Sequence, residues 1–423
     1  MTVIFYILSA LLIYFSYRSL RGGFDYLNYF KNELARPRST YAPFATVIAP
    51  CKGLDDGLRQ NLLALLEQDY PEYEVIFVVD DERDPAIPVI EMLLNRRPAE
   101  TLSKKIQPQI DADGRGYDHG LNASFENSAS QCLCGSKLII APKATDSSQK
   151  VENLREAIMH ASDKSQVFVF VDSDTRPAKE WLRSLVAPLK NKSIGTTTGY
   201  RWFISKNPTF ASELRNIWNA SIASALDADT KNNFCWGGSM AIQRDTFEEL
   251  NIGEKWRGTL SDDFTVTRAM WEAKLPIHFV PQALTASIED CTFREMLEFT
   301  TRQMKITRVY AQKLWLMSFF GSGLFCAVMI ASFAIIVLSG RNNIPVFVSI
   351  ATIVLVSVCS VSKSWLRLNA ARLALPRYKN ELQHQYLPHL TLWLLSPAVF
   401  LYNCVVALFS RTMTWRGIRY KMI

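Results

Sequence analysis

The sequence predicts an α/β domain with a mostly parallel sheet, joined to helical membrane segments. Between residues 40 and 290, short apolar runs alternate with amphipathic helical patterns. Strands that alternate with helices form a parallel sheet with helices on both faces. Uncharged stretches at the two ends of the chain are long enough to enter a bilayer, which predicts the membrane segments.

Each element of the α/β region has its own local pattern. The apolar runs 46–50, 74–79, 137–141 and 167–171 are predicted as strands. Helical patterns end near Gln68 and cover 89–94 and 151–161. Segment 111–136 is rich in Asn, Ser, Gly and Asp and is expected to be an exposed insertion. In such folds, ligands bind beyond the carboxyl ends of the strands.

The apolar stretches predict an N-terminal anchor and three C-terminal membrane segments. Thr2–Tyr17 has no charge and is followed by Arg18. A cleaved signal peptide carries its positive charge before the apolar stretch, so an uncleaved anchor is favoured. The C-terminal runs are 314–340, 344–362 and 390–410. Pro388 and Pro397 favour a re-entrant or interfacial last segment, with a full span as the alternative.

Charge suggests how the chain is placed. Basic residues flank the apolar runs, which favours a cytoplasmic location for the middle domain of an integral membrane protein. The net charge of +7 forms no concentrated basic stripe, so no nucleic-acid partner is expected. The expected division is an anchor at 1–17, the cytoplasmic α/β domain at 18–291, an interfacial basic helix at 292–313, transmembrane or re-entrant helices at 314–410 and a basic tail at 411–423.

An Asp-x-Asp motif is the strongest local sign of chemistry. The apolar run Val167–Val171 leads directly into Asp172-Ser173-Asp174, which places two carboxylates at the carboxyl edge of a strand. Mg²⁺ and Mn²⁺ prefer oxygen ligands and usually keep substrate phosphates in their coordination shell. The motif therefore suits a metal-bound nucleotide diphosphate. A plain turn after a strand is the alternative.

Two further acidic motifs follow other elements. The cluster Asp80–Asp84 comes after the strand predicted at 74–79, and a nucleoside could hydrogen-bond to one of its carboxylates. A solvated loop is the alternative there. Asp262 and Asp263 begin a helical pattern after Ser261, and one of them could serve as a general base toward an acceptor hydroxyl. Helix capping by Ser261 explains the same residues without catalysis.

Two more segments are candidates for binding. In Trp236-Gly237-Gly238, the glycines would allow close backbone approach to a ligand and the tryptophan could stack on a sugar. A tight turn is equally compatible. Residues 293–313 mix large apolar and basic side chains, as expected for a helix in the membrane interface that offers cations to a diphosphate. A simple basic flank of a membrane span is the alternative.

In their order along the chain, these motifs resemble the ceramide glucosyltransferases, family 21 of the glycosyltransferases within the GT-A group. The resemblance spans nearly the whole chain, from Ala49–Gly53 to the tail Thr414–Tyr420. Lys150 and Asn153 match the Lys-x-x-Asn-Leu segment of this family. The Asp-x-Asp motif and Asp262-Asp263-Phe264 follow in the order of the family.

The resemblance implies a GT-A fold, a UDP-sugar donor (UDP-glucose above all), a divalent metal, Mg²⁺ or Mn²⁺, and transfer with inversion to a ceramide-like membrane lipid. It implies that Asp263 is the catalytic base and that Asp172 and Asp174 hold the metal. The implied nucleotide-sugar site consists of Asp81, Asp84, Lys150, Asn153 and Asp172. The implied acceptor and diphosphate side consists of Trp236, Gly237, Gly238, Asp262, Arg302, Gln303 and Lys305.

One motif departs from the family pattern. The family motif (Gln/Arg)-x-x-Arg-Trp aligns with Arg302–Ile306, so that Lys305 replaces an arginine and Ile306 a tryptophan. Lysine keeps the charge but lacks the planar fork of arginine. Tyr310 and Trp315 are candidates to replace the tryptophan. The departure bears on the acceptor.

Other functions remain open at this stage. The acceptor could be another lipid, such as a hopanoid or a diacylglycerol. A polysaccharide synthase is an alternative, although it would need enough helices for a polymer channel. An inactive GT-A-shaped membrane scaffold is the non-enzyme alternative, and the three intact acidic motifs argue against it.

Overall fold

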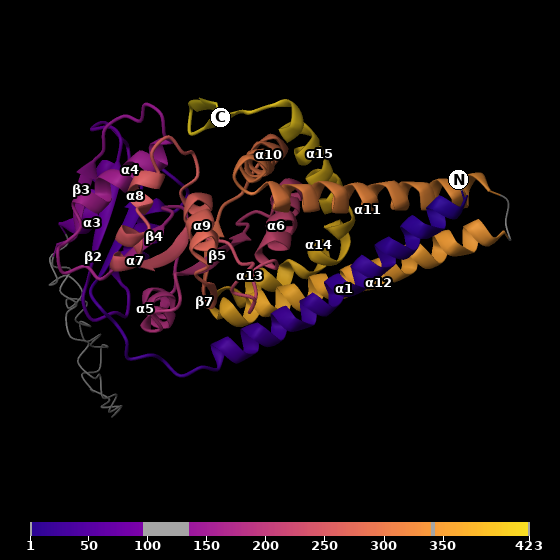
Figure 1. The fold of residues 1–423 in the computed structure, drawn as a ribbon, viewed down its shortest axis with the longest axis horizontal. Coiled ribbons are helices and arrows are strands. Elements are labelled where there is room, and N and C mark those ends of the chain that lie inside the picture. The colour runs from indigo at the N-terminus through magenta and orange to yellow at the C-terminus, as the bar shows by residue number, and fades with distance from the viewer. Residues whose placement is uncertain (1, 96–134, 340–342, 422–423) are drawn as a thin grey trace, which may run out of the picture.

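The computed structural model describes residues 2–95, 135–339 and 343–421. A sheet-containing domain forms one end of the molecule, and three long helices extend away from it toward the other end (Figure 1). Most of the expected insertion, residues 111–134, lies outside the described residues.

A seven-stranded mixed sheet organises the domain, which confirms the predicted α/β class. Its order is β3-β2-β1-β4-β6-β5-β7. The strands are β1 Ala45–Pro50, β2 Tyr73–Val79, β3 Lys137–Ile140, β4 Val167–Val171, β5 Thr196–Ile204, β6 Ser239–Gln243 and β7 Ile277–Ile288. β6 runs antiparallel to both of its neighbours, whereas the other neighbouring strands pair in parallel. The four strands expected from the sequence are β1 to β4.

Alternating side chains bury both faces of this sheet. On one face, residues such as Val47 and Val169 pack under α2 Leu58–Leu66, α3 Ile87–Leu94 and α5 Trp181–Val186. On the other face, Ile48 and Phe170 pack under α4 Gln149–Met159, α8 Ile252–Lys255 and α9 Asp262–Ala273. The period of two residues in a strand produces this division. The result is three layers, with the sheet in the middle.

In the part of the chain that the structure describes, three helices are long and apolar enough to cross a membrane. They are α1 Thr2–Leu34, α11 Gln312–Leu338 and α12 Ile344–Ala374. The pair Tyr386–Leu394 and Ser396–Phe409 is bent by 55° and could be a fourth, broken span or a re-entrant loop. Helix α1 continues well past Tyr17, and its second half reaches the sheet, where the Tyr29 hydroxyl donates to the Phe279 carbonyl at 2.6 Å. The domain is thereby fixed to the membrane helices.

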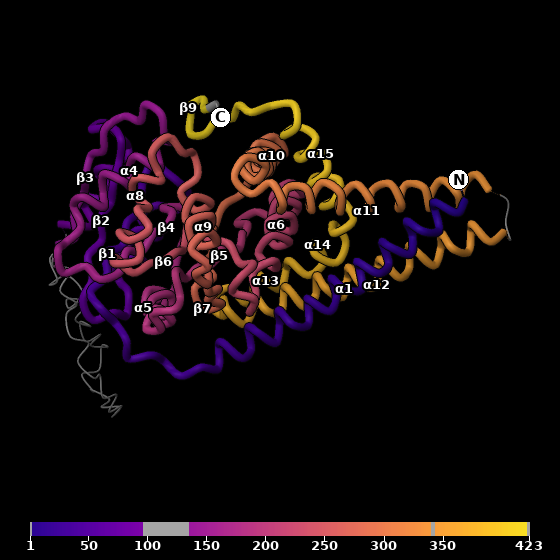
Figure 2. The backbone as a smooth tube through the Cα atoms, viewed as in Figure 1, coloured from indigo at the N-terminus to yellow at the C-terminus, as the bar shows by residue number. Residues whose placement is uncertain are grey.

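The remaining elements complete the domain and connect it to the helical part. The helices are α6 Phe210–Ala223, α7 Arg244–Glu249, α10 Phe293–Tyr310, α13 Lys379–His384, α14 Tyr386–Thr391 and α15 Ser396–Phe409, with short 3₁₀ turns at Ala187–Lys190, Pro376–Tyr378 and Leu392–Leu394. A final two-stranded hairpin, β8 Thr412–Trp415 and β9 Ile418–Lys421, follows α15. Figure 2 shows the chain crossing back from α15 over the domain to this hairpin.

Candidate active site

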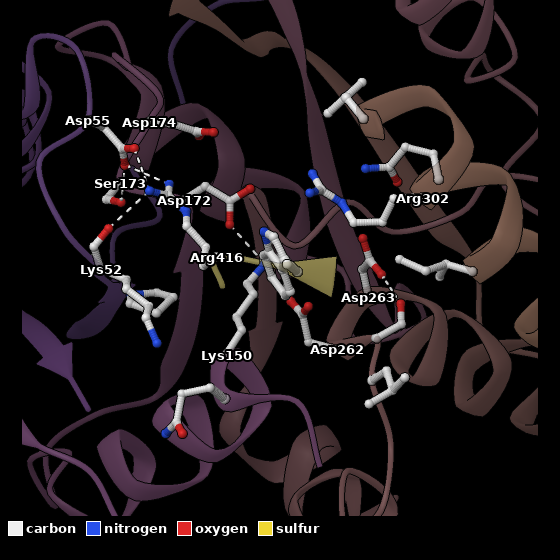
Figure 3. A pocket seen from close by; sticks show the side chains of 18 of the residues that line it. Lys52, Asp55, Lys150, Asp172, Ser173, Asp174, Asp262, Asp263, Arg302 and Arg416 are labelled. Carbon is white, nitrogen blue, oxygen red and sulfur yellow. Dashed lines mark hydrogen bonds and ion pairs between the residues drawn. The ribbon is translucent and has the colours of Figure 1, made fainter. Parts of the chain in front are cut away.

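A cavity of about 580 Å³ opens where the carboxyl ends of β1 and β4 meet the amino ends of α4 and α9. β2 and β4 lie on opposite sides of β1 in the sheet, so the strand order reverses direction at β1. Open α/β sheets bind ligands at such a reversal, beyond the carboxyl ends of the strands. Charged groups in the lining include Lys52, Asp55, Lys150, Asp172, Asp174, Arg201, Asp262, Asp263, Arg302 and Arg416. Figure 3 shows how these side chains converge.

Asp172 and Asp174 are held by two cations. Arg201, on β5, places one guanidinium nitrogen 2.9 Å from Asp172 Oδ2 and another 3.2 Å from Asp174 Oδ2. Lys150 Nζ lies 2.8 Å from Asp172 Oδ1 and 3.2 Å from Asp262 Oδ2. The Asp-x-Asp motif therefore belongs to a network of charges and is more than a solvated turn.

Burial and charge act differently on these carboxylates. Burial favours the protonated form of Asp172, but the charges of Lys150 and Arg201 outweigh it and lower the pKa below the usual range. Burial dominates at Asp174 and Asp262, and it raises the pKa of each despite the nearby cations. Asp172 is therefore the carboxylate that the network holds most firmly in its charged form.

The Asp-x-Asp pair fits a divalent metal of the Mg²⁺ type. Asp174 Oδ1 is buried and has no hydrogen-bond partner among the described residues. Within residues 2–95, 135–339 and 343–421, no group of three or more His, Cys, Asp or Glu side chains could form an all-protein metal site. Mg²⁺ does not require one, since it is commonly bound by one or two carboxylates together with substrate phosphates.

Asp263 lies in the first turn of α9 and faces the cavity. Ser261 caps this helix, because its hydroxyl accepts a hydrogen bond from the backbone N–H of Phe264. Asp263 Oδ1 accepts from the same N–H at 2.7 Å and from the Ser261 hydroxyl. Its Oδ2 accepts from the Gly237 N–H at 3.3 Å. The cap predicted for this helix start is present, and Asp263 also lines the cavity, so its role as a base stays a prediction.

The Trp236-Gly237-Gly238 segment packs tightly against the acidic residues. A Cβ on Gly237 would lie 2.0 Å from Asp262 Oδ2, and one on Gly238 would collide with the Trp236 ring. The Trp236 ring lies 4.7 Å from the Arg201 guanidinium carbon. Trp236 is thereby positioned as a wall of the cavity beside the cation that holds the Asp-x-Asp motif.

The residues expected around the nucleotide occupy two different places. Asn153 lines the cavity, and its Oδ1 accepts a hydrogen bond from Gln149. Asp84 is buried under the loop after β1, where it accepts from the N–H of Gly53 at 2.9 Å and of Ala86 at 2.8 Å. Asp81 is exposed and pairs with Lys143 at 3.2 Å, away from the main cavity. The structure therefore does not bring Asp81 and Asp84 into the lining with Lys150 and Asn153.

Comparison with known proteins identifies the family. Glycosyl transferase family 21 matches residues 3–111 and 133–423. The chain belongs to this family. Ceramide glucosyltransferase of Komagataella phaffii is 30% identical over 96 residues, which are 23% of this chain and 18% of the relative. Ceramide glucosyltransferase of Gibberella zeae is 36% identical over 208 residues, 45% of this chain and 34% of the relative. The chain thus aligns with about a third or less of these curated relatives.

Solved structures also resemble this family 21 chain. A mannosyltransferase, PcManGT from Pyrobaculum calidifontis, solved with GDP-Man and Mn²⁺, is similar over 93% of this chain and 99% of its own, with a TM-score of 0.41 and 16% identity. Glucosyl-3-phosphoglycerate synthase from Mycobacterium tuberculosis, solved with Mn²⁺ and UDP-glucose, is similar over 67% of this chain and 82% of its own, with a TM-score of 0.35 and 12% identity.

Helix α10 carries the segment that departs from the family 21 pattern. Arg302 and Gln303 line the cavity. Lys305 does not, because its Nζ donates to Ser410 Oγ at 3.0 Å and to the Thr412 carbonyl at 2.7 Å. Burial lowers the pKa of Arg302 to about 10.

An aromatic ring does lie beside this helix, although Ile306 replaces the family tryptophan. The Trp415 ring, from the C-terminal hairpin, lies 5.4 Å from the Arg302 guanidinium carbon. Tyr310 hydrogen-bonds to the Leu260 N–H through its hydroxyl, and Trp315 lies beside Arg308. Neither of these two candidates lines the cavity, whereas Trp415 does.

Sequence reasoning missed several charged residues of the site, among them Arg201, Asp55 and Arg416. Arg201 lies in a strand whose nine residues are all buried. An arginine in such a strand requires a partner, and that requirement was a usable signal. Asp55 and Arg416 pair with each other at 2.7 Å from opposite ends of the chain, and no local pattern indicates such a contact.

Proposed function

We propose that this family 21 protein is an inverting glycosyltransferase that moves glucose from UDP-glucose to the hydroxyl of a ceramide-like membrane lipid. The observation that carries the proposal is the convergence of Asp263, the Asp-x-Asp pair, Lys150 and Arg201 on one cavity beside the membrane helices. The names of the ceramide glucosyltransferase relatives support this choice of donor and acceptor.

Each group has a proposed task in a single displacement. The acceptor hydroxyl oxygen forms a bond to the anomeric carbon while the bond from that carbon to the diphosphate oxygen breaks, and UDP leaves. Asp263 accepts the hydroxyl proton, and its hydrogen bonds from Gly237 and Phe264 fix its orientation. Lys150 and Arg201 provide positive charge on the side where the diphosphate departs.

Asp172 and Asp174 are the proposed metal holders. When bound, a divalent cation supplies further positive charge to the diphosphate. The unpartnered, buried Asp174 Oδ1 supports this assignment. Asp84 would then act at a distance from the cavity, by shaping the loop after β1 that forms part of the lining.

The lipid would reach the site from the membrane side. α10 borders the cavity and leads directly into α11, so a membrane surface at this junction would lie close to Asp263 and Arg302. Basic residues beside the apolar helices favour the cytoplasmic leaflet as this surface. The polar headgroup could then enter while the acyl chains remain in the bilayer.

The test is a product screen with the full-length protein in detergent. UDP-glucose, UDP-GlcNAc and UDP-galactose would each be offered with ceramide, diacylglycerol or a hopanoid, with Mn²⁺ or Mg²⁺ and with EDTA, and lipid products would be detected by mass spectrometry. We expect glucosylated ceramide that is absent with EDTA and strongly reduced with Asp263→Asn. A different glycolipid would overturn the proposed acceptor. No transfer at all, with no binding of UDP, would overturn the enzyme assignment.

A further inference from the structure

The C-terminal hairpin, residues 412–421, closes one side of the cavity. Trp415, Arg416, Ile418 and Tyr420 all belong to the lining. The hairpin contacts the cavity wall through both of its strands. In β9, the Tyr420 hydroxyl accepts from the Gln149 N–H at 3.2 Å, and in β8, Met413 packs with Leu260. Gln149 begins α4, the helix that carries Lys150. The hairpin therefore touches the same element that positions the main lysine of the site.

Arg416 occupies an unfavourable backbone position at the tip of this hairpin. Trp415 pairs with Ile418, so Arg416 and Gly417 form a two-residue turn. Their φ angles are +49° and +79°. Glycine, asparagine and aspartate are the residues that such turns favour, and an arginine there costs conformational energy. A strained residue of this kind is a reason to look for a function of its side chain.

The Arg416 side chain is directed into the site. Its guanidinium lies 2.7 Å from Asp55 Oδ1 and donates to the Lys52 carbonyl at 3.0 Å. Asp172 and Asp174 are near enough to act on it, since after the hydrogen bond to Asp55 their charges contribute to raising the Arg416 pKa against the effect of burial. Figure 3 shows Arg416 between Asp55 and the Asp-x-Asp motif.

Arg416 also remains accessible to a ligand. Its side chain is 38% exposed, whereas those of Lys150 and Arg201 are 13% and 11% exposed. The two buried cations are each shared between two carboxylates. Among the described residues, Arg416 pairs with one carboxylate, that of Asp55, through both terminal nitrogens, and its Nε–H is available to a phosphate oxygen.

We propose that Arg416 binds the diphosphate of the nucleotide-sugar donor, so that the C-terminal hairpin completes the donor site. This inference rests on the proposed function and adds a residue to its donor site. Asp55 holds the arginine beside the cavity. When the donor binds, the diphosphate oxygens accept hydrogen bonds from the same guanidinium. The strained turn directs the guanidinium toward the Asp-x-Asp motif.

The alternative is that Arg416 only fastens the hairpin to Asp55. The two roles are separated by comparing Arg416→Ala, Arg416→Lys and Asp55→Asn in the full-length protein. Binding of uridine and of UDP would be measured by calorimetry in the presence of Mn²⁺. Arg419→Ala is the matched control, because Arg419 is exposed on the same hairpin and outside the lining. Melting temperatures would check that each variant is folded.

We expect Arg416→Ala to weaken UDP binding about tenfold to a hundredfold and to leave uridine binding within about twofold, since a charge-assisted hydrogen bond is lost. Arg416→Lys should recover part of the loss. Asp55→Asn should weaken UDP binding less than Arg416→Ala does, because it leaves the arginine available to the phosphates.

Three results would overturn the inference. Equal weakening by Asp55→Asn and Arg416→Ala, or equal weakening of uridine and UDP, would show that Arg416 only holds the hairpin. Unchanged UDP binding in Arg416→Ala would also overturn it while leaving the proposed function intact. Failure of the unmodified protein to bind UDP would instead overturn the proposed function itself.

Discussion

The backbone N–H of Gly237 donates to the carboxylate of Asp263 at 3.3 Å, and this bond joins the glycine turn before β6 to the first turn of α9. This bond holds Oδ2 of Asp263, whereas the Ser261 hydroxyl donates to the other oxygen, Oδ1. A carboxylate held from both sides keeps one geometry toward the cavity, which is what a general base requires.

Substitution of the two neighbouring aspartates of α9 should affect different kinetic constants. Asp263→Asn removes the proposed base, so we expect kcat to fall about a hundredfold to ten-thousandfold with donor binding kept. Asp262→Asn removes a partner of Lys150, so we expect a higher KM for the donor. Steady-state kinetics combined with UDP calorimetry would distinguish them. Near-normal kcat in Asp263→Asn would exclude its role as the base.

Gly237→Ala should impair the site without unfolding the protein. The new Cβ would lie 2.0 Å from Asp262 Oδ2 and 3.0 Å from Lys150 Nζ, so the ion pair between them must shift. We expect kcat/KM to fall at least about tenfold, because a misplacement of about 1 Å can cost a hundredfold. Gly22→Ala is the control, since a Cβ there meets nothing within 4 Å. Equal activity of the two variants would contradict the prediction.

Substitution of Arg302 should mainly lower activity, whereas substitution of Lys305 should mainly weaken the attachment of the hairpin. Arg302→Ala removes a half-buried cation of the cavity, and we expect kcat/KM to fall about a hundredfold. Lys305→Ala removes hydrogen bonds to Ser410 and Thr412, and we expect mainly a lower melting temperature, with about 1–2 kcal/mol of stability lost. Lys313→Ala, at an exposed position, is the control. A greater loss of activity in Lys305→Ala would reverse this assignment.

His278 should make the folded domain sensitive to mild acid. Burial lowers its pKa to about 4, with a smaller effect of Arg36 in the same direction. The unfolded chain takes up the proton near pH 6.5, so the stabilisation is complete above that pH and is lost as the pH falls toward 4. The full loss is on the order of 3 kcal/mol.

The measurement for His278 is the melting temperature in detergent at pH 7.5 and pH 5. His278→Gln should show a smaller decrease between the two pH values than the unmodified protein, because it has no proton to take up. His384→Gln, changed on the exposed surface of α13, should behave like the unmodified protein. The same decrease in all three proteins would assign the acid sensitivity to other groups.

The sequence by itself determined part of the elements and much of the acidic site. The run Val167–Val171 has the composition of a buried strand, so it places Asp172 at a sheet edge wherever the strand lies. Ser261 before two acids determines a helix start. The apolar stretches determined the long C-terminal helices, because their length and lack of charge are local properties. Each of these signals is contained in fewer than about 25 neighbouring residues.

Only the tertiary structure decided which distant charges meet. Arg201 reaches the Asp-x-Asp motif because β5 and β4 are placed on either side of β6, and Arg416 reaches Asp55 because the hairpin folds back over the cavity. It also decided that Lys305 holds the hairpin and that Trp415, from the far end of the chain, stands beside Arg302. Contacts of this kind depend on strand order and on packing between distant segments, and short-range patterns in a single sequence do not encode either.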